Sequence, residues 1–342
     1  MLSRAFFAIC ISAALMSACS GMDSERQSGR SHRHPAKKHK HKKQESTPDA
    51  RSAEELVTLA RVALKEDRYD RCIELATKAI QKDQNLARAY SLRADASIKS
   101  LNGDDKTAES DLRTATALAP NNPEPHELLA ELLYEKKDVD GALKEVTRAI
   151  ELSPKDKGLN ELRAGLYDQI GKKELAMADL QAAIDKQPEQ IANYLVRAQY
   201  AEKYGLQDEA LKDYSEGIKR SKQKITDLAK QEGYKRRAML LSKMGRHKEA
   251  VADLSTVIKV NDDDDDALRL RGDEYAALND FDRAVNDYTK AIELSPDYAR
   301  ASLEARAKAY EHLGKTALAK NDLEKAAHLE YKRAEKPVFE LH

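Results

Sequence analysis

The side chains in this sequence that could perform catalysis or bind a metal are few and scattered. The densest group of possible cation ligands is a run of five aspartates at residues 262–266. A calcium loop of the EF-hand type that began at Asp262 would need Gly at its sixth position and Glu at its twelfth, where this chain has Ala267 and Asp273. Acidic side chains also cap the free amides at the start of a helix, and we expect the aspartates to have that role.

The motifs that mark common enzyme classes are missing from the sequence. It contains no G-x-S-x-G, no G-x-x-x-x-G-K-[ST], no H-E-x-x-H and no C-x-x-C. His126, His247 and His312 are widely separated and lack a set of partners, so we expect them at the surface. These observations predict no catalytic residue, no metal site and no cofactor, and therefore a protein that is not an enzyme.

The composition favours long helices. Of the 342 residues, 35% are charged, 41% are hydrophobic and only 5% are aromatic, and there is no Trp. Sandwiches and barrels need more β-branched and aromatic side chains than this. Lys plus Arg and Asp plus Glu each number 59, yet residues 1–50 carry nine basic and four acidic side chains. We therefore predict a helical body that is preceded by a basic segment.

The first twenty residues have the pattern of an export signal. The apolar run of residues 5–16 is too short to span a bilayer as a stable anchor. The segment Leu15-Met16-Ser17-Ala18-Cys19 resembles the lipobox of bacterial lipoproteins. This resemblance implies a signal peptide over residues 1–18 and a lipid on Cys19 that anchors the protein in a membrane. Because Ser20 rather than Asp follows the cysteine, the resemblance implies the outer membrane, with the body facing the periplasm. The alternative is a buried N-terminal helix.

Residues 19–52 form a polar linker that cannot support a core. Its basic arm, residues 26–43, carries eight Lys or Arg, four His and no acid. Three interpretations stay open: a solvated tether, a segment that binds an anionic lipid or peptidoglycan, and a metal-binding histidine tract. The histidines lack the spacing of a well-defined zinc site. The export signal makes nucleic acid an unexpected partner.

From residue 53 onward the sequence repeats with a period near 34. The clearest copy spans residues 265–298 and contains Leu268, Gly272, Tyr275, Phe281, Ala284, Tyr288, Ala291 and Pro296. This pattern resembles the tetratricopeptide repeat, and the resemblance implies an all-α fold, a right-handed α-solenoid of paired helices. The period gives eight repeats, numbered 1 to 8, followed by a tail at 334–342: 53–86, 87–122, 123–156, 157–190, 191–224, 231–264, 265–298 and 300–333.

Small residues recur at two positions of every repeat. Position 8 is Ala in all repeats except repeat 7, which has Gly272, and position 20 is Ala in all except repeat 1, which has Cys72. Small side chains allow the two helices of a repeat to approach closely. We therefore predict that Cys72 is a buried packing residue.

Two charged positions vary together. Six repeats have Arg at position 7, and the same six have Asp at position 23, whereas repeats 1 and 3 have neither residue. This co-occurrence predicts an ion pair between the two helices of a repeat, with a structural role. The predicted pairs are Arg93–Asp111, Arg163–Asp179, Arg197–Asp213, Arg237–Asp253, Arg271–Asp287 and Arg306–Asp322.

The resemblance also implies where a partner would bind. In tetratricopeptide arrays, positions 2, 5, 9, 12 and 13 of the first helices line a concave groove. In repeats 3 and 4 these positions hold no Lys or Arg, and seven of them are acidic or aromatic: Glu124, Glu127, Glu131, Tyr134, Glu135, Glu161 and Asp168. Such a surface would attract a basic peptide or protein segment, with Tyr134 as an aromatic contact for its cations. A solvated helix face is the alternative.

The function expected from these features is a non-enzymatic scaffold of the cell envelope that binds a protein or peptide. The alternative is an envelope-anchoring protein whose basic arm binds an anionic polymer or lipid, with the repeats as a spacer or as an activator of a cell-wall enzyme.

Overall fold

The structure is a computed structural model that describes residues 51–100, 104–154 and 158–335. The predicted signal peptide, Cys19, the basic arm and the tail from residue 336 onward lie outside the described residues. The predictions made for those segments therefore stay predictions.

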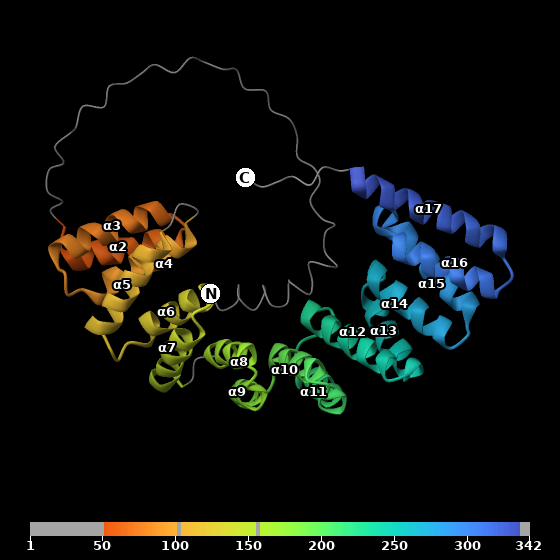
Figure 1. Cartoon of the computed structure of the whole chain (residues 1–342), viewed down its shortest axis with the longest axis horizontal. Helices are drawn as coiled ribbons and strands as arrows, with labels where there is room; N and C mark the ends of the chain where they lie inside the picture. Colours follow the sequence, from red (N-terminus) through yellow and green to blue (C-terminus); the bar gives the residue numbers. More distant parts are fainter. Residues whose placement is uncertain (1–50, 101–103, 155–157, 336–342) are drawn as a thin grey trace, which may run out of the picture. The chain divides into compact units, whose positions relative to one another are not determined.

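The described residues form sixteen α-helices and one short 3-10 helix, Pro296–Tyr298, and they contain no strand (Figure 1). This confirms the all-α prediction and the solenoid of helix pairs. The first and second helices of successive repeats are α2 (Ala53–Lys65) and α3 (Tyr69–Lys82), α4 (Ala87–Lys99) and α5 (Asp105–Leu118), α6 (Pro123–Glu135) and α7 (Val139–Leu152), α8 (Leu159–Gln169) and α9 (Lys173–Lys186), α10 (Ile191–Lys203) and α11 (Gln207–Arg220), α12 (Leu228–Lys243) and α13 (His247–Val260), α14 (Asp265–Ala277) and α15 (Phe281–Leu294), and α16 (Arg300–His312) and α17 (Thr316–Glu335).

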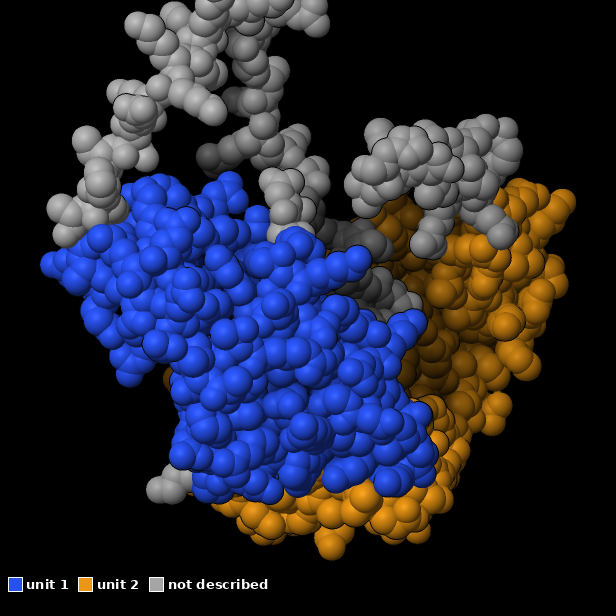
Figure 2. Space-filling view, turned by 60° about the vertical axis from the view of Figure 1, so that its left-hand side comes forward, with its two compact units in different colours: residues 1–172 blue, residues 173–342 orange. Residues whose placement is uncertain are grey.

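The chain divides into two compact units, residues 1–172 and 173–342 (Figure 2). The boundary falls in the turn between α8 and α9, inside the fourth repeat. Within each unit, the second helix of one repeat packs against the first helix of the next, and successive first helices also contact one another. The first helices therefore form a continuous row in each unit, and this row carries the predicted groove positions.

Helix ends are stabilised by the side chains that the sequence places there. Ser52 and Glu55 form a reciprocal capping box at the start of α2. Asn122 caps α6 just before Pro123, which is tolerated in a first helical turn. In the run of five aspartates, Asp264 accepts a hydrogen bond from the Ala267 amide at 2.9 Å and caps α14, which confirms the expected capping role for this one aspartate.

The turn between the two helices of a repeat always uses a left-handed residue where it is described. This residue is position 15 of the repeat, and its φ lies between 55° and 78° in seven repeats. Four of the seven are glycines, for which a positive φ has no steric cost. The seven residues are Asp67, Lys137, Gly171, Gly205, Gly245, Asn279 and Gly314.

The small residues at positions 8 and 20 lie in the core, as predicted. Cys72 is fully buried, its Sγ lies 3.5 Å from the Leu92 carbonyl oxygen, and burial raises the pKa of its thiol to about 11. Gly272 replaces Ala for a local reason, because a Cβ at that position would lie 2.6 Å from Cε1 of Tyr288. The glycine therefore makes room for a buried tyrosine.

Candidate functional site

The predicted acidic groove lies on two first helices of the first unit, α6 and α8, and α4 lies beside α6. Helix α6 contacts both α4 and α8, so the outward positions of the three helices form one surface. Glu131 lies in the middle of α6 and is half-buried. Burial, together with the nearby charges of Glu127, Asp95 and Glu135, raises the pKa of Glu131 to about 7, and Lys99 partly opposes this effect. The structure thus brings three of the predicted acids together and adds Asp95, which sequence reasoning missed.

Glu161, on α8, is a second carboxylate with an unusual environment. Burial alone raises its pKa to about 7. Neither Glu161 nor Glu131 makes a hydrogen bond or an ion pair with another described residue. Half-buried carboxylates are normally paired, since desolvation of a charge is costly. Glu131 and Glu161 are therefore the half-buried carboxylates on α6 and α8 that lack a hydrogen-bond or ion-pair partner among the described residues.

The other predicted groove residues have ordinary surroundings. Glu124 lies exposed in the first turn of α6, and Glu135 lies exposed at its end, where burial and the charge of Asp105 raise its pKa. Tyr134 is partly buried against the core of the first unit, so only part of its ring is available to a ligand. Asp168 is half-buried on α8.

Lys99 is the cation that acts on Glu131, and it lies outside the two repeats that the sequence singled out. It occupies position 13 of repeat 2 and forms an ion pair with Asp95 at 2.8 Å, one turn earlier on α4. Asp95 and Lys99 stand at groove positions 9 and 13, so extending the same comparison to repeat 2 would have found both. The exposed Arg88 stands at position 2 of the same helix, so α4 adds two basic residues to the acids of α6 and α8.

The half-buried acids at groove positions on the first helices of the second unit are paired instead. Arg236 donates to Glu232 at 2.5 Å, and Lys235 lies 3.1 Å from Asp264. Arg269 binds Asp266 at 2.7 Å and Asp273 at 3.0 Å. The unsatisfied carboxylates are thus a property of α6 and α8, and not of every first helix that is described.

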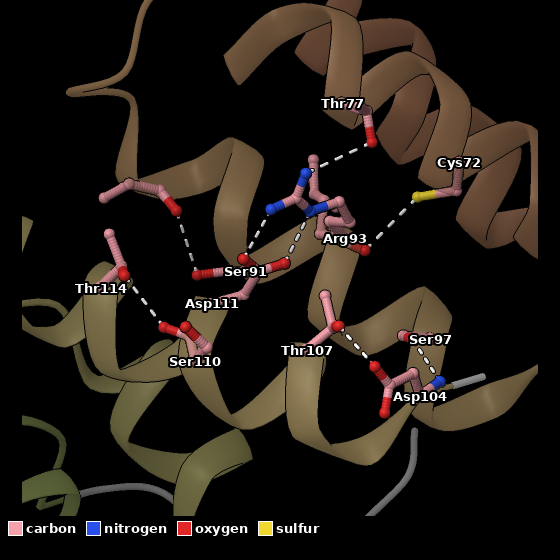
Figure 3. Close-up of polar contacts among 12 residues, drawn as sticks. Cys72, Thr77, Ser91, Arg93, Ser97, Asp104, Thr107, Ser110, Asp111 and Thr114 are labelled. Carbon is pink, nitrogen blue, oxygen red and sulfur yellow. Dashed lines mark hydrogen bonds and ion pairs between the residues drawn. The ribbon is translucent and has the colours of Figure 1, made fainter. Parts of the chain in front are cut away.

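Five of the six predicted arginine–aspartate pairs lie within one unit, and all five form. Each Arg donates through Nε and Nη2 to the two carboxylate oxygens of its Asp, a bidentate geometry that combines charge with two hydrogen bonds. In repeat 2 both distances from Arg93 to Asp111 are 2.7 Å (Figure 3). The other four pairs are Arg197–Asp213, Arg237–Asp253, Arg271–Asp287 and Arg306–Asp322. Arg163 and Asp179 belong to different units, so their pairing stays a prediction.

Each of the six arginines at position 7 also reaches the preceding repeat, which the sequence comparison missed. Arg93 Nη1 donates to Thr77 Oγ1 on α3 at 3.4 Å (Figure 3). The acceptor always stands at position 25 of the preceding repeat, and it is a hydroxyl or an amide oxygen. The remaining contacts are Arg163 to Thr147, Arg197 to Gln181, Arg237 to Ser215, Arg271 to Ser255 and Arg306 to Thr289. A polar residue at position 25 is the signal that could have revealed them.

Repeat 3 replaces the arginine pair with a buried histidine, which corrects the expected surface placement of His126. His126 is only 8% exposed, and its Nδ1 lies 2.6 Å from Oε2 of Glu145, the residue at position 23. His247 is half-buried against Glu274 at 2.8 Å, so its placement at an open surface was also wrong. His312 is exposed, as expected, but its ring stacks on Phe281. The partners of His126 and His247 lie on other helices, 19 and 27 residues away in the sequence, so the sequence alone did not reveal them.

The described residues contain no group of three or more His, Cys, Asp or Glu side chains that could hold a metal ion. No helix among them is both long and apolar enough to cross a membrane.

Three protein-family models match the chain. A model described as the ETO1 C-terminal domain matches residues 46–200, a tetratricopeptide repeat model matches residues 232–264, and a TPR repeat model matches residues 272–321. No curated protein sequence matches it.

Solved structures with similar folds include a tetratricopeptide repeat protein from Parabacteroides merdae, which is 19% identical, with 80% of this chain and 98% of that chain covered and a TM-score of 0.48. PilF of Pseudomonas aeruginosa is 17% identical, with coverages of 61% and 91% and a TM-score of 0.49. YrrB, described as a TPR protein with an unusual peptide-binding site, is 19% identical, with coverages of 57% and 97% and a TM-score of 0.45. The helix pairs and the matched repeat models together show that this chain is built from tetratricopeptide repeats.

Proposed function

We propose that this protein is a scaffold of the cell envelope that binds a basic protein or peptide segment on α4, α6 and α8. The observation that carries the proposal is the pair of half-buried carboxylates, Glu131 and Glu161, that lack a partner among the described residues. A Lys or Arg of a ligand would supply the missing charge to either side chain, and would lower the cost of keeping it ionised.

The size of the row suits an extended segment. Three neighbouring first helices, with axes about 8 to 10 Å apart, span the length of roughly six to eight extended residues. Several weak contacts over that length give useful affinity without a deep cavity. A basic segment would be attracted from a distance as well, so its binding should weaken as salt is added.

Charge reversal tests this proposal directly. Glu131→Lys combined with Asp168→Lys should weaken the capture of a fluorescent peptide of alternating Lys and Ser by about tenfold or more, and should flatten its salt dependence. The matched control reverses two exposed acids on second helices, Glu209 and Asp282, and changes net charge equally. If both double variants behave alike, the acidic row is ordinary surface.

The envelope location is part of the same proposal, and the lipobox resemblance supports it. Cys19→Ala should abolish incorporation of labelled palmitate and release the protein from membranes. Continued labelling of that variant would disprove the lipid anchor. Cys72→Ala is the matched control, because Cys72 is buried and Ala fills its position in the other repeats.

The basic arm supports a second candidate function, attachment to an anionic polymer or lipid. Residues 26–43 have eight Lys or Arg and no acid, which suits peptidoglycan or acidic headgroups. Deleting them should abolish pelleting with isolated cell walls if this candidate is correct. A scaffold would keep its protein partner after the same deletion, so a cross-linking pull-down from membranes distinguishes the two.

A further inference from the structure

The last two repeats contain an open cavity of about 420 Å³. It lies between α14 and α16, in the second unit, and is separate from the acidic row of the first unit. Its floor is made of small side chains, among them Ala276, Ala305 and Ala309, with the buried Tyr288 beneath. A cavity of this volume falls in the range of binding pockets for small ligand groups.

Two of the side chains that line the cavity are small, Ala276 and Ala305. Ala305 stands at position 6, where the six preceding repeats carry Leu, Val or Arg, such as the buried Leu92 of repeat 2. Ala276 stands at position 12, where repeats 1 to 3 carry Leu, Ile or Tyr. Between repeats 7 and 8 both positions therefore carry Ala, which occurs between no other two successive repeats.

One wall of the cavity is aromatic. The rings of Phe281 and His312 stack in parallel, with centroids 4.3 Å apart and an angle of 6° between their planes. Both residues line the cavity, and His312 is exposed. A further ring that enters the cavity can continue this stack, which an aliphatic side chain cannot do.

The charged side chain of the cavity lining that lacks an ion-pair partner among the described residues is a lysine, Lys308. Its two acids are already satisfied, since Asp273 accepts hydrogen bonds from Tyr288 and Arg269, and Glu304 accepts one from Arg300. Lys308 lines the same cavity, is exposed, and forms no ion pair or hydrogen bond with another described residue. The complementary group on a ligand is therefore a carboxylate.

We infer that this cavity binds a partner peptide through an aromatic side chain that has an acidic residue beside it. The aromatic ring occupies the space above Ala276 and Ala305 and stacks against His312 and Phe281. The neighbouring carboxylate pairs with Lys308. This site goes beyond the proposed function, because it takes a different ligand on different helices.

The probe is a fluorescent nonapeptide of Gly and Ser with Phe-Glu at its centre, titrated with the full chain. Ala305→Leu should weaken its binding by about tenfold or more, because Leu fills the space that the ring needs. The fold should survive, since Leu occupies position 6 in four other repeats. The matched control is Ala317→Leu, an exposed position on α17, and it should leave binding unchanged.

Two further substitutions, one in the probe and one in the protein, measure separately how much the aromatic ring and the carboxylate of the probe contribute to binding. Replacing Phe by Ala in the probe should remove binding, whereas Lys308→Gln should weaken it severalfold and remove its salt dependence. Glu131→Lys should have no effect on this probe, so failure here and failure of the proposed function are distinguishable. Thermal unfolding of each variant checks that the fold is intact.

Three outcomes would overturn the inference. The first is no binding of the probe at millimolar concentration, and the second is equal binding by the wild type and Ala305→Leu. The third is a rise in affinity when residues 336–342 are deleted. That segment contains Phe339-Glu340, so the rise would identify the chain's own tail as the occupant in place of a partner.

Discussion

Arg271 on α14 holds both carboxylate oxygens of Asp287 on α15, at 2.7 and 2.8 Å, while the same guanidinium donates to Ser255 of the preceding repeat at 3.2 Å. The Asp side chain is 6% exposed and the Arg side chain is 19% exposed. One arginine therefore joins three helices from two repeats. Its ring contact with Tyr275 adds a further neighbour on its own helix.

Removing one member of this pair should cost far more than removing both. Asp287→Ala leaves a mostly buried guanidinium without its partner, and we expect a loss of about 3 kcal/mol in the free energy of unfolding. The double variant Arg271→Met with Asp287→Leu should lose about 1 kcal/mol or less, because an apolar pair of similar size avoids the desolvation cost. Urea unfolding measures both. The exposed pair of Arg246 and Glu249 is the control, and its alanine variants should stay within about 1 kcal/mol of wild type. Additive losses in the cycle would show that Arg271 and Asp287 are not coupled.

Gly272→Ala should destabilise the protein by about 1 to 3 kcal/mol, because the new Cβ would lie 2.6 Å from the Tyr288 ring. Tyr288→Leu should then restore much of the loss, since repeats 2, 4 and 6 combine Ala at position 8 with Leu at position 24. Thermal unfolding of both single variants and the double variant tests this. A double variant no more stable than Gly272→Ala alone would mean that the ring is not the obstacle.

Lys137→Gly should stabilise the protein by about 1 kcal/mol. Lys137 has a φ of 62°, which strains a residue with a Cβ and leaves glycine unstrained. Lys136→Gly is the matched control, because Lys136 has a φ of −73° and gains nothing from glycine. The control should be neutral or slightly destabilising in the same urea titration. If Lys136→Gly were more stable than Lys137→Gly, the strain that we assign to the left-handed residue at position 15 would be contradicted.

Glu131→Gln should stabilise the protein at high pH only. Burial and the charges of Glu127, Asp95 and Glu135 raise the pKa of Glu131 to about 7, so the folded state holds a proton that the unfolded state has already lost above pH 5. Stability therefore falls as pH rises from about 5 through 7, and Lys99 offsets part of this loss.

We expect Glu131→Gln to gain about 1 to 2 kcal/mol at pH 8.5 and almost nothing at pH 5. Glu124→Gln, on the exposed first turn of the same helix, should show no such difference. Unfolding curves of both variants at the two pH values decide the matter. In the wild type, capture of the basic probe should strengthen between pH 6 and pH 8, as Glu131 ionises.

Much of the fold followed from the sequence because a repeat supplies its own internal comparison. Cys72 could be placed in the core since seven other repeats have Ala at its position, and the arginine pairs could be placed since Arg and Asp occur together. Contacts without a repeating partner could not be found in this way. His126 has no counterpart in another repeat, so its burial against Glu145 became visible only in the structure.

The sequence predicted which residues occupy the candidate site, but not their burial, their raised pKa values or the nearby Lys99. The positions of Glu131 and Glu161 on successive first helices followed from the period, but their burial depends on how closely α4, α6 and α8 pack. Lys99 was overlooked because charge was compared only within repeats 3 and 4. The cavity at Ala305 could have been suspected from the small residue at position 6, although its aromatic wall requires a contact between α15 and α16.

The left-handed residue at position 15 places the reversal of direction at one point in each described turn. In each of these seven repeats that residue follows the first helix after a single C-cap residue, so the chain reverses at the same point of the repeat. The remaining turn residues are consequently open to variation without altering the stacking of repeats. Insertions should be accepted in this array where repeat 2 already has two extra residues, near 102–105, and rejected between positions 14 and 16 of the other repeats. The turns within the repeats, more than the helices, therefore constrain how this sequence can change, and insertions can accumulate in the turn segments outside positions 14 to 16.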